Sequence, residues 1–305
     1  MSKNVPNYIK LYKGGELKNR VELLKKKLRN CTLCNHRCNV NRIANKRGFC
    51  GAGENMIITC YGPHFGEEKG LVGTGGSGTI FFSYCTMRCV FCQNYDLSQY
   101  PQGNEESPQR LSDIMIELQE KGCHNINLVS PTHFVPQIIE GIYLAIGKGL
   151  SIPIVYNTGS YDDYETIKLL DGVIDIYVPD IKFFDNDKGL KYTKCEGYFN
   201  NAKKVIKEMY RQVGDLEVNR EGIAVKGILL RHLIMPNNIE DSKEVLKFIV
   251  NELSHNTVVD IMGLYKPMYK ANEYHEISKE LNSSEFEDVV QYAKDIGLTK
   301  LILSK

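Results

Sequence analysis

The sequence lacks any apolar run approaching the ~18 residues that a membrane-spanning helix needs. Its first residues also lack the apolar core of a secretory signal peptide. Positive and negative charges nearly cancel, leaving a formal net charge of +1, so there is no cationic excess of the kind that favours nucleic acid or membrane surfaces. These absences predict a cytoplasmic protein that has neither nucleic acid nor a membrane as its partner.

Cysteine stands out among the residues that the chain does contain. Its 305 residues include 10 cysteines, while 42% hydrophobic and 25% charged residues describe an ordinary globular protein. In a chain of this size without a signal peptide, cysteines bind metal or perform chemistry more often than they form disulfides. Seven of the ten fall into two groups, and we expect the isolated Cys60, Cys123 and Cys195 to be inert side chains.

The second group lies directly after a strand-like apolar run at 79–82 and consists of Cys85, Cys89 and Cys92. Thiolates favour iron–sulfur clusters and zinc, and a four-iron cluster normally takes four cysteines, one for each iron. Three cysteines leave one iron open to a substrate or cofactor. Unligated buried thiols or a zinc site are the alternatives, but structural zinc sites usually have their cysteines in two pairs. The spacing therefore favours a catalytic iron–sulfur cluster.

The first group has four members, which are Cys31, Cys34, Cys38 and Cys50. It follows an amphipathic pattern at 16–29 that predicts a helix. Four thiolates can close a tetrahedral site, and the neighbouring glycines allow the tight turns that wrap a metal. Zinc and a second iron–sulfur cluster both accept four thiolates, so the spacing predicts a metal site without deciding between them.

Strand-like and helix-like segments alternate along the rest of the chain. Apolar, β-rich runs lie at 79–84, 125–130, 152–157, 174–181, 226–235 and 257–262. Helical patterns separate them at 109–121, 133–148, 161–171, 199–213 and 238–254. This alternation predicts an α/β fold with a parallel sheet and crossover helices. The glycine-rich stretch at 62–78 predicts a loop, and it is not a phosphate-binding loop because no Gly-Lys-Ser/Thr follows.

The three-cysteine motif, with the aromatic Phe91 before its third cysteine, resembles the signature of the radical S-adenosylmethionine (radical SAM) superfamily. The Asp-x-Lys at 180–182 and the segments at 154–158, 208–216 and 265–267 are similar to the pyruvate formate-lyase-activating enzyme-like group, and to a subgroup with an N-terminal four-cysteine segment. The resemblance implies a partial, open (β/α)6 TIM-like barrel over 61–305. A small cysteine-rich, metal-binding segment over 1–60 would precede it.

The resemblance also implies a set of site residues. Cys85, Cys89 and Cys92 would hold a [4Fe–4S] cluster whose fourth iron binds S-adenosylmethionine. In parallel barrels the site lies at the carboxyl ends of the strands, so the polar residues there are the expected cofactor contacts. Alternation places Asp180 and Lys182 on one face, suited to the ammonium and carboxylate of the cofactor, with a simple ion pair as the alternative. The expected cofactor contacts are Phe91, Ser130, Asn157, Thr158, Asp180, Lys182, Arg231 and His232.

The implied reaction is that of a radical SAM oxidoreductase. One electron into the cluster cleaves the sulfonium bond, giving methionine and a 5′-deoxyadenosyl radical that takes a hydrogen atom from the substrate. For activating enzymes the hydrogen comes from a glycine of a partner protein, and a reductant such as flavodoxin or ferredoxin supplies the electron. The alternatives are radical modification of a small molecule or another peptide, and a non-enzymatic iron–sulfur redox or sensing protein. The last alternative leaves the polar strand ends without a role.

Overall fold

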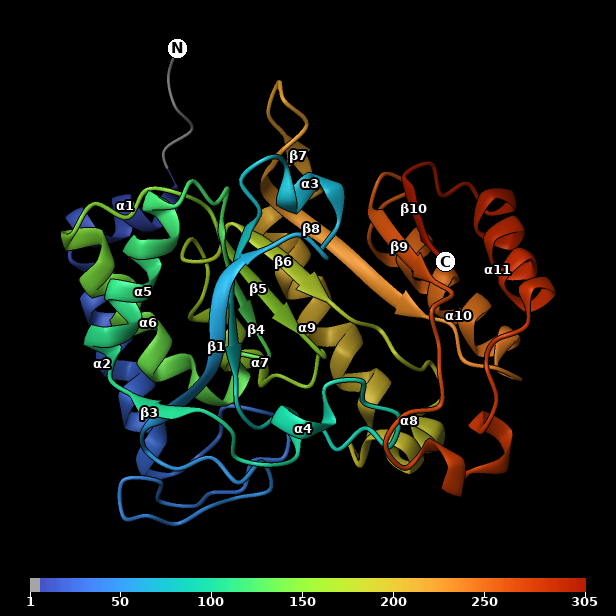
Figure 1. The fold of residues 1–305 in the computed structure, drawn as a ribbon, viewed down its shortest axis with the longest axis horizontal. Helices are drawn as coiled ribbons and strands as arrows, with labels where there is room; N and C mark the ends of the chain where they lie inside the picture. Colours follow the sequence, from blue (N-terminus) through green and yellow to red (C-terminus); the bar gives the residue numbers. More distant parts are fainter. Residues whose placement is uncertain (1–5) are drawn as a thin grey trace.

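The computed structural model describes residues 6–305, which fold around one curved sheet (Figure 1). Its strands lie in the order β10-β9-β8-β6-β5-β4-β2-β1-β3, and β7 pairs with β8. The strands of the described residues are β1 (Met56–His64), β2 (Ser77–Phe82), β3 (Asn104–Glu106), β4 (Ile126–Val129), β5 (Ile154–Thr158), β6 (Ile176–Pro179), β7 (Glu217–Val218), β8 (Ala224–Leu233), β9 (Val258–Met262) and β10 (Leu301–Ser304).

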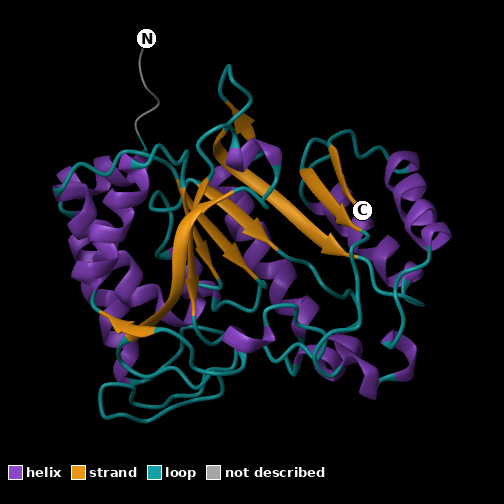
Figure 2. Cartoon of the chain, in the orientation of Figure 1, coloured by secondary structure: helices purple, strands orange, loops and turns teal. Residues whose placement is uncertain are grey.

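Helices cover the outer side of the sheet, and its inner side encloses the barrel interior (Figure 2). The α-helices are α1 (Asn7–Lys13), α2 (Glu16–Lys26), α3 (Lys69–Val72), α4 (Tyr95–Ser98), α5 (Pro108–Glu120), α6 (Val135–Gly147), α7 (Tyr164–Lys168), α8 (Asn186–Thr193), α9 (Tyr198–Val213), α10 (Ile239–Glu252) and α11 (Ser283–Asp295). Short 3-10 helices lie at η1 (Lys27–Arg29), η2 (Thr132–Phe134), η3 (Ala271–Glu273) and η4 (His275–Ile277). Among residues 6–305, no helix combines the length and the apolar character needed to cross a bilayer.

The parallel part of the sheet consists of β2, β4, β5, β6, β8 and β9, with β10 added at the edge. The first six match the six apolar runs of the sequence, and the five helical patterns between them form α5, α6, α7, α9 and α10. The expected α/β fold with a partial, open barrel is therefore confirmed. The proposed division of the chain at residue 60 stays a prediction, and β1 runs through that position.

Alternation along the strands sorts their side chains onto two faces. Tyr156 of β5 and Leu230 of β8 belong to the main core, which includes helix residues such as Ile138 and Val205. The residues one position earlier, Val155 and Leu229, lie in a smaller cluster with Leu71 of α3. Leu71 thus fills the inner side of the barrel near the amino ends of the strands. The carboxyl ends, at the bottom of Figure 1 near α4, are left for polar side chains.

The glycine-rich stretch at 62–78 is not the continuous loop that its composition predicted. β1 extends to His64 and pairs antiparallel with β2, and α3 follows at Lys69–Val72. Two close approaches explain part of the glycine content. A Cβ on Gly75 would lie 2.0 Å from the carbonyl oxygen of Gly122, and Gly73 has φ +45°. Only glycine fits such positions without strain, so the composition reports local crowding as well as turns.

The amino-terminal segment begins with the predicted helix at 16–29, observed as α2 followed by η1. Leu17, Val21 and Leu24 form its buried face, and α2 packs against α6 on the outside of the barrel. Residues 30–55 then wrap beneath the carboxyl ends of the strands without forming a regular helix or strand (Figure 1). This course carries the first cysteine group to the same end of the barrel as the second.

Candidate functional site

The second cysteine group lies in the loop that leaves β2 at the carboxyl edge of the sheet. The backbone N–H of Arg88 donates to the carbonyl of Thr193 at 2.9 Å, and the N–H of Val90 donates to Tyr192 at 2.9 Å. Tyr84 takes a positive φ of 70° where the loop turns out of the strand, and its N–H donates to Leu97. The loop is therefore held in place by α4 on one side and by the end of α8 on the other.

The three thiols of this loop lie close enough to influence one another. Burial, with a smaller contribution from Cys92, raises the pKa of Cys85 to about 11. Burial also raises the pKa of Cys89, while the nearby Lys182 opposes that shift. The backbone N–H of Met87 donates to the Cys85 sulfur at 3.4 Å, a contact that favours a thiolate. One buried and two partly buried thiols beside an ammonium and an amide donor fit a thiolate-bound cluster.

Ser130 and Asn157 lie at the ends of the next two parallel strands. The Ser130 side chain hydrogen-bonds to Cys85, and its backbone N–H donates to the Asn157 carbonyl at 2.9 Å. Ser130 has a φ of 53°, so the chain turns sharply there. Asn157 follows Val155 by two residues and shares its inward face. Both predicted residues therefore border the three thiols or the barrel interior.

Asp180 and Lys182 form an ion pair on the inner face after β6, as alternation predicted. Lys182 Nζ lies 2.6 Å from Asp180 Oδ2. Burial alone would lower the pKa of Lys182, but Asp180 and Cys89 outweigh it and hold that pKa well above its usual value. The Asp180 backbone carbonyl accepts bonds from Ser160 and Tyr198, which fixes the strand end. A permanent cation thus stands beside the thiols.

Arg231 occupies the inner face of β8, where acidic residues already surround it. Its Nε and Nη2 donate to the two carboxylate oxygens of Glu68 at 2.6 Å each, and Glu67 is a third contact. Asp260 pairs directly across from Arg231 on β9, and burial together with Glu68 raises the pKa of Asp260 to about 6. Sequence reasoning missed Glu67, Glu68 and Asp260, for which the only signal was an acidic pair within the glycine-rich stretch.

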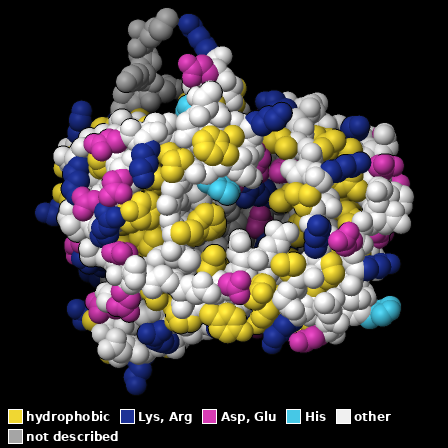
Figure 3. Space-filling model, in the orientation of Figure 1, with side chains coloured by type: hydrophobic (Ala, Val, Ile, Leu, Met, Phe, Trp, Pro, Cys, Tyr) yellow, Lys and Arg dark blue, Asp and Glu magenta, His cyan; other side chains and the backbone are white. Residues whose placement is uncertain are grey.

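The contact between Glu68 and Arg231 joins two separate parts of the open sheet, because Glu68 follows β1 and Arg231 belongs to β8, with β2, β4, β5 and β6 between them. Figure 3 shows a hollow on this face of the molecule, between the part built around β1 and the part that carries β9 and β10. Acidic and basic atoms are visible inside the hollow. The barrel interior is therefore lined with charge as well as with apolar side chains.

Two predicted cofactor contacts lie on the other side of the sheet. Thr158 shares the outward face of Tyr156, and both hydroxyls donate to the buried Asp162 at 2.7 Å. His232 shares the outward face of Leu230, and its Nδ1 lies 2.7 Å from the Ile181 carbonyl. These two side chains face outward because side chains alternate along a strand, and the neighbouring Asn157 and Arg231 take the inward positions. Neither side chain is placed to touch a cofactor inside the barrel.

Phe91 is buried among other aromatic rings. Its ring centroid lies 6.0 Å from that of Phe183 and 6.3 Å from that of Tyr265. The ring therefore packs into the core next to the cysteine loop, and the backbone of Phe91 is the part left near the thiols.

The first cysteine group lies against this loop. Cys31, Cys34 and Cys50 are buried and Cys38 is partly buried. Cys34 also forms an isolated antiparallel bridge with Asp162, just past β5. Among residues 6–305, no three His, Cys, Asp or Glu side chains are already as close as ligands of one bound ion.

Comparison with known proteins identifies relatives over most of the chain. The family model of the Radical SAM superfamily matches residues 79–249. The uncharacterized protein MJ0674 of Methanocaldococcus jannaschii is 34% identical over 302 residues, covering 96% of this chain and 82% of that protein. A pyruvate formate-lyase-activating enzyme of Listeria monocytogenes is 27% identical over 220 residues, covering 67% of this chain and 83% of the enzyme.

A solved structure shares the fold. SuiB of Streptococcus suis bound to S-adenosylmethionine superimposes with a TM-score of 0.52 at 14% sequence identity. The match covers 73% of this chain and 48% of SuiB, so this chain spans about half the length of that protein. The likeness concerns the barrel alone.

Proposed function

Because the chain belongs to the radical SAM superfamily, and to its pyruvate formate-lyase-activating enzyme-like part, we propose that it generates a 5′-deoxyadenosyl radical to abstract hydrogen from a substrate. The family implies a [4Fe–4S] cluster and S-adenosylmethionine. The observation that carries the proposal is the set of three thiols, of which Cys89 is buried and Cys85 and Cys92 are partly buried, beside Ser130 and the Asp180–Lys182 pair. Such a cluster, when bound, supplies the electron that breaks the sulfonium bond.

In this proposal the protein's own residues bind and orient. Cys85, Cys89 and Cys92 hold the three protein-bound irons. Lys182 stays charged and is placed to attract a carboxylate, while Asp180 offers an acceptor to an ammonium group. Asn157 adds an amide on the same inward face. Leu71 and its neighbours close the amino end of the interior, which limits water there.

The proposed substrate is a protein or peptide, with a glycine of a glycyl-radical enzyme as the hydrogen donor in the activase-like case. The name of the Listeria relative supports this substrate class. A pocket of about 360 Å³ near the ends of β6 and β8, lined in part by Phe183, Met235 and Pro236, gives a partner chain a place to approach. A small molecule or another peptide remains the second candidate, and a non-enzymatic iron–sulfur redox or sensing role is the third.

The remaining partners follow from the same chemistry. We propose a cytoplasmic reaction in which a reductant such as flavodoxin or ferredoxin supplies the electron. We also propose a second metal at Cys31, Cys34, Cys38 and Cys50, either zinc or a second iron–sulfur cluster, because both accept four thiolates.

The test is release of 5′-deoxyadenosine by anaerobically reconstituted, reduced protein given S-adenosylmethionine. We expect release by the wild type and none by Cys89→Ala. A glycyl-radical partner, added to the same mixture, should increase release and acquire an organic radical signal. Cys60→Ser is the matched control, because Cys60 is exposed and belongs to neither cysteine group. A loaded cluster that neither cleaves nor binds S-adenosylmethionine would leave only the redox or sensing role.

A further inference from the structure

In the four-cysteine segment, backbone N–H groups donate hydrogen bonds to the cysteine sulfurs. The backbone N–H of Phe49 donates to the Cys38 sulfur at 3.3 Å. Cys34 receives a backbone N–H from His36, and Cys50 receives one from Ala52. Amide donors aimed at sulfur stabilise the negatively charged form. Three of the four cysteines therefore have the donor that a metal-bound thiolate uses.

The chain around these cysteines is tightly wound. The N–H of Cys31 donates to Val40 and the N–H of Asn39 donates back to Cys31, each at 3.0 Å. A Cβ on Gly48 would lie 2.8 Å from the Cys38 sulfur, so only glycine lets the returning segment pass this close. The local apolar cluster is small and consists of Leu28, Cys31, Leu33 and Val40. Apolar packing within the segment is therefore limited, and a bound metal would add to the contacts that hold its fold.

The same segment holds the loop of the second cysteine group. His36 Nε2 lies 2.9 Å from the Thr86 carbonyl, between Cys85 and Cys89 in sequence. Arg88 Nη2 donates to the Phe49 carbonyl at 2.9 Å, and its guanidinium lies over the Phe49 ring. Arg47 Nη1 donates to the Tyr84 hydroxyl at 3.0 Å. Tyr84, Thr86 and Arg88 of the loop are thus hydrogen-bonded to the segment that carries the first cysteine group.

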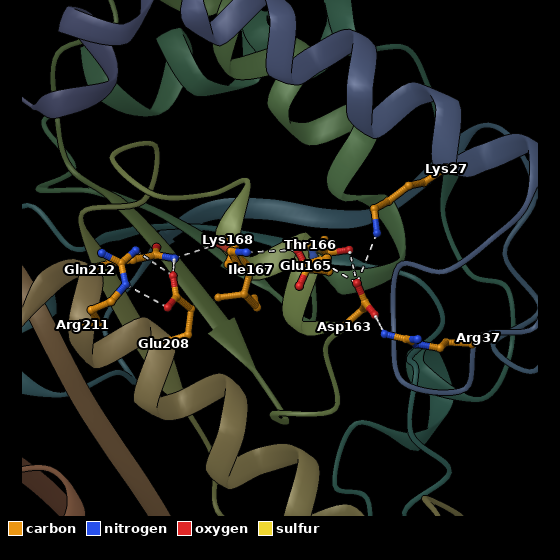
Figure 4. Close-up of polar contacts among 10 residues, drawn as sticks. All are labelled: Lys27, Arg37, Asp163, Glu165, Thr166, Ile167, Lys168, Glu208, Arg211 and Gln212. Carbon is orange, nitrogen blue, oxygen red and sulfur yellow. Dashed lines mark hydrogen bonds and ion pairs between the residues drawn. The ribbon is translucent and has the colours of Figure 1, made fainter.

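A second set of contacts ties the segment to the barrel. Figure 4 shows Lys27 and Arg37 reaching Asp163 from two directions, at 3.2 and 2.6 Å. Asp163 also accepts the N–H of Thr166 and so caps α7. Arg42 is 1% exposed and donates to the carbonyls of Gly53 and His133. These contacts fix the segment against the barrel. A shift of the segment would therefore also shift the loop that carries Cys85, Cys89 and Cys92.

We propose that Cys31, Cys34, Cys38 and Cys50 bind a metal centre whose role is to brace the loop that carries Cys85, Cys89 and Cys92. The shared chemistry is a shell of four thiolates, which suits one zinc ion or one iron–sulfur cluster. The metal part stands independently of the proposed radical chemistry, while the bracing part rests on it. Removing the metal loosens the His36 and Phe49 contacts and leaves the second loop without support on one side.

The first experiment uses the triple variant Cys85→Ala, Cys89→Ala, Cys92→Ala, which has only the first group. We expect about one zinc per chain, or about four irons with equal acid-labile sulfide, by elemental analysis. Adding Cys34→Ser should lower this content at least about fivefold, while Cys60→Ser should not change it. A metal-free triple variant overturns the proposal, even if the wild type cleaves S-adenosylmethionine. Retained metal without cleavage by the wild type would instead count against the proposed function.

The second experiment tests the brace in chains that keep all seven cysteines. His36→Phe preserves the ring against Phe49 but removes the bond to Thr86, and His36→Gln keeps a donor. We expect His36→Phe to change the electron paramagnetic resonance signal of the reduced cluster and its response to S-adenosylmethionine, with cleavage slowed about tenfold. His36→Gln should restore both. An unchanged signal and a cleavage rate within twofold of wild type in His36→Phe would overturn the bracing role.

Discussion

The two cysteine groups lie at the same end of the barrel and differ in one respect that decides their chemistry. The segment with Cys31, Cys34, Cys38 and Cys50 offers four sulfurs and is wrapped by its own backbone. The loop with Cys85, Cys89 and Cys92 offers three, with Ser130 hydrogen-bonded to Cys85 and Lys182 close to Cys89. A closed shell holds a structure together, whereas an open shell leaves a place for reaction. In the proposals made above, the number of ligands is what separates a bracing centre from a reactive one.

Removing a ligand of the open group should have the largest effect. Cys89→Ala takes away one of three protein ligands, and a cluster without it is neither retained nor held in place. We expect 5′-deoxyadenosine release to fall at least ~1000-fold, with melting temperature nearly unchanged. Chromatographic quantification of the nucleoside, together with iron analysis, gives the result. Appreciable release by this variant would remove the distinction between the two groups.

Changing the charge beside the open group should have the next largest effect. Lys182→Met keeps the stem but removes the cation paired with Asp180. We expect S-adenosylmethionine to bind about 10- to 100-fold more weakly, which corresponds to about 1.4 to 2.8 kcal/mol. Equilibrium binding to the oxidised, cluster-loaded protein measures the change. Lys168→Met, at an exposed pair on α7, serves as the control and should bind as the wild type does.

Weakening the anchor of the closed group should lower stability without touching the reaction directly. Asp163→Asn keeps a cap on α7 but loses the charge that pairs with Lys27 and Arg37. We expect a loss of about 2 kcal/mol at pH 7, discounted because Arg37 is largely exposed. Denaturant unfolding of the variant and of the exposed neighbour variant Glu165→Gln measures it. Equal stability of the two variants would show that this anchor contributes nothing.

The same residue predicts a pH dependence. Burial alone would raise the pKa of the Asp163 carboxyl, but Lys27 and Arg37 outweigh it and hold that pKa below its usual range. Its stabilising contribution is therefore present above the unfolded-state pKa, near ~4, and is lost as the pH falls through the lower folded-state value. In Asp163→Asn the free energy of unfolding should therefore fall less steeply toward acid pH. Denaturant unfolding at several pH values measures the difference.

Titration of the Asp175 carboxyl, far from both cysteine groups, should have the smallest effect on stability. Its pH dependence should be opposite in sign to that of Asp163. Burial raises the pKa of Asp175 to about 7, next to its bond from the Ile154 N–H. A raised folded-state pKa gives stability that is full below ~4 and declines as the pH rises through 7. Asp175→Asn should remove this decline and stabilise the chain by about 1 to 2 kcal/mol at pH 8. Unfolding curves at pH 5 and 8 test it, and the metal content should stay constant.

Much of this molecule can be read from local patterns. The six parallel strands follow from apolar runs, and the short spacing of Cys85, Cys89 and Cys92 places them together in the loop after β2, while their role as cluster ligands stays a prediction. Inward and outward positions were less well predicted. Asn157 and Thr158 are adjacent in one strand and cannot both face the interior, and the same parity separates Arg231 from His232. Applying alternation to these pairs would have removed one member of each.

Other features depend on partners far along the chain. Glu68 is an ordinary surface residue by sequence, and only its contact with Arg231, 163 positions away, brings it into the interior. β1 was missed because its Gly62 and Pro63 resemble a loop, although pairing with β2 keeps it extended. Tertiary pairing overrode local propensity there.

The path of the backbone also sets an order of assembly. All four cysteines of the first group, and the amides that face their sulfurs, occur by residue 52. The loop of the second group is pinned by the carbonyls of Tyr192 and Thr193, more than a hundred residues beyond Cys85. A ribosome releasing this chain from its amino terminus therefore exposes a complete four-thiol site long before the three-thiol loop can take its final shape. If both groups bind as proposed, the four-thiol group has all its ligands available early in synthesis, while the three-thiol group has to wait for the barrel.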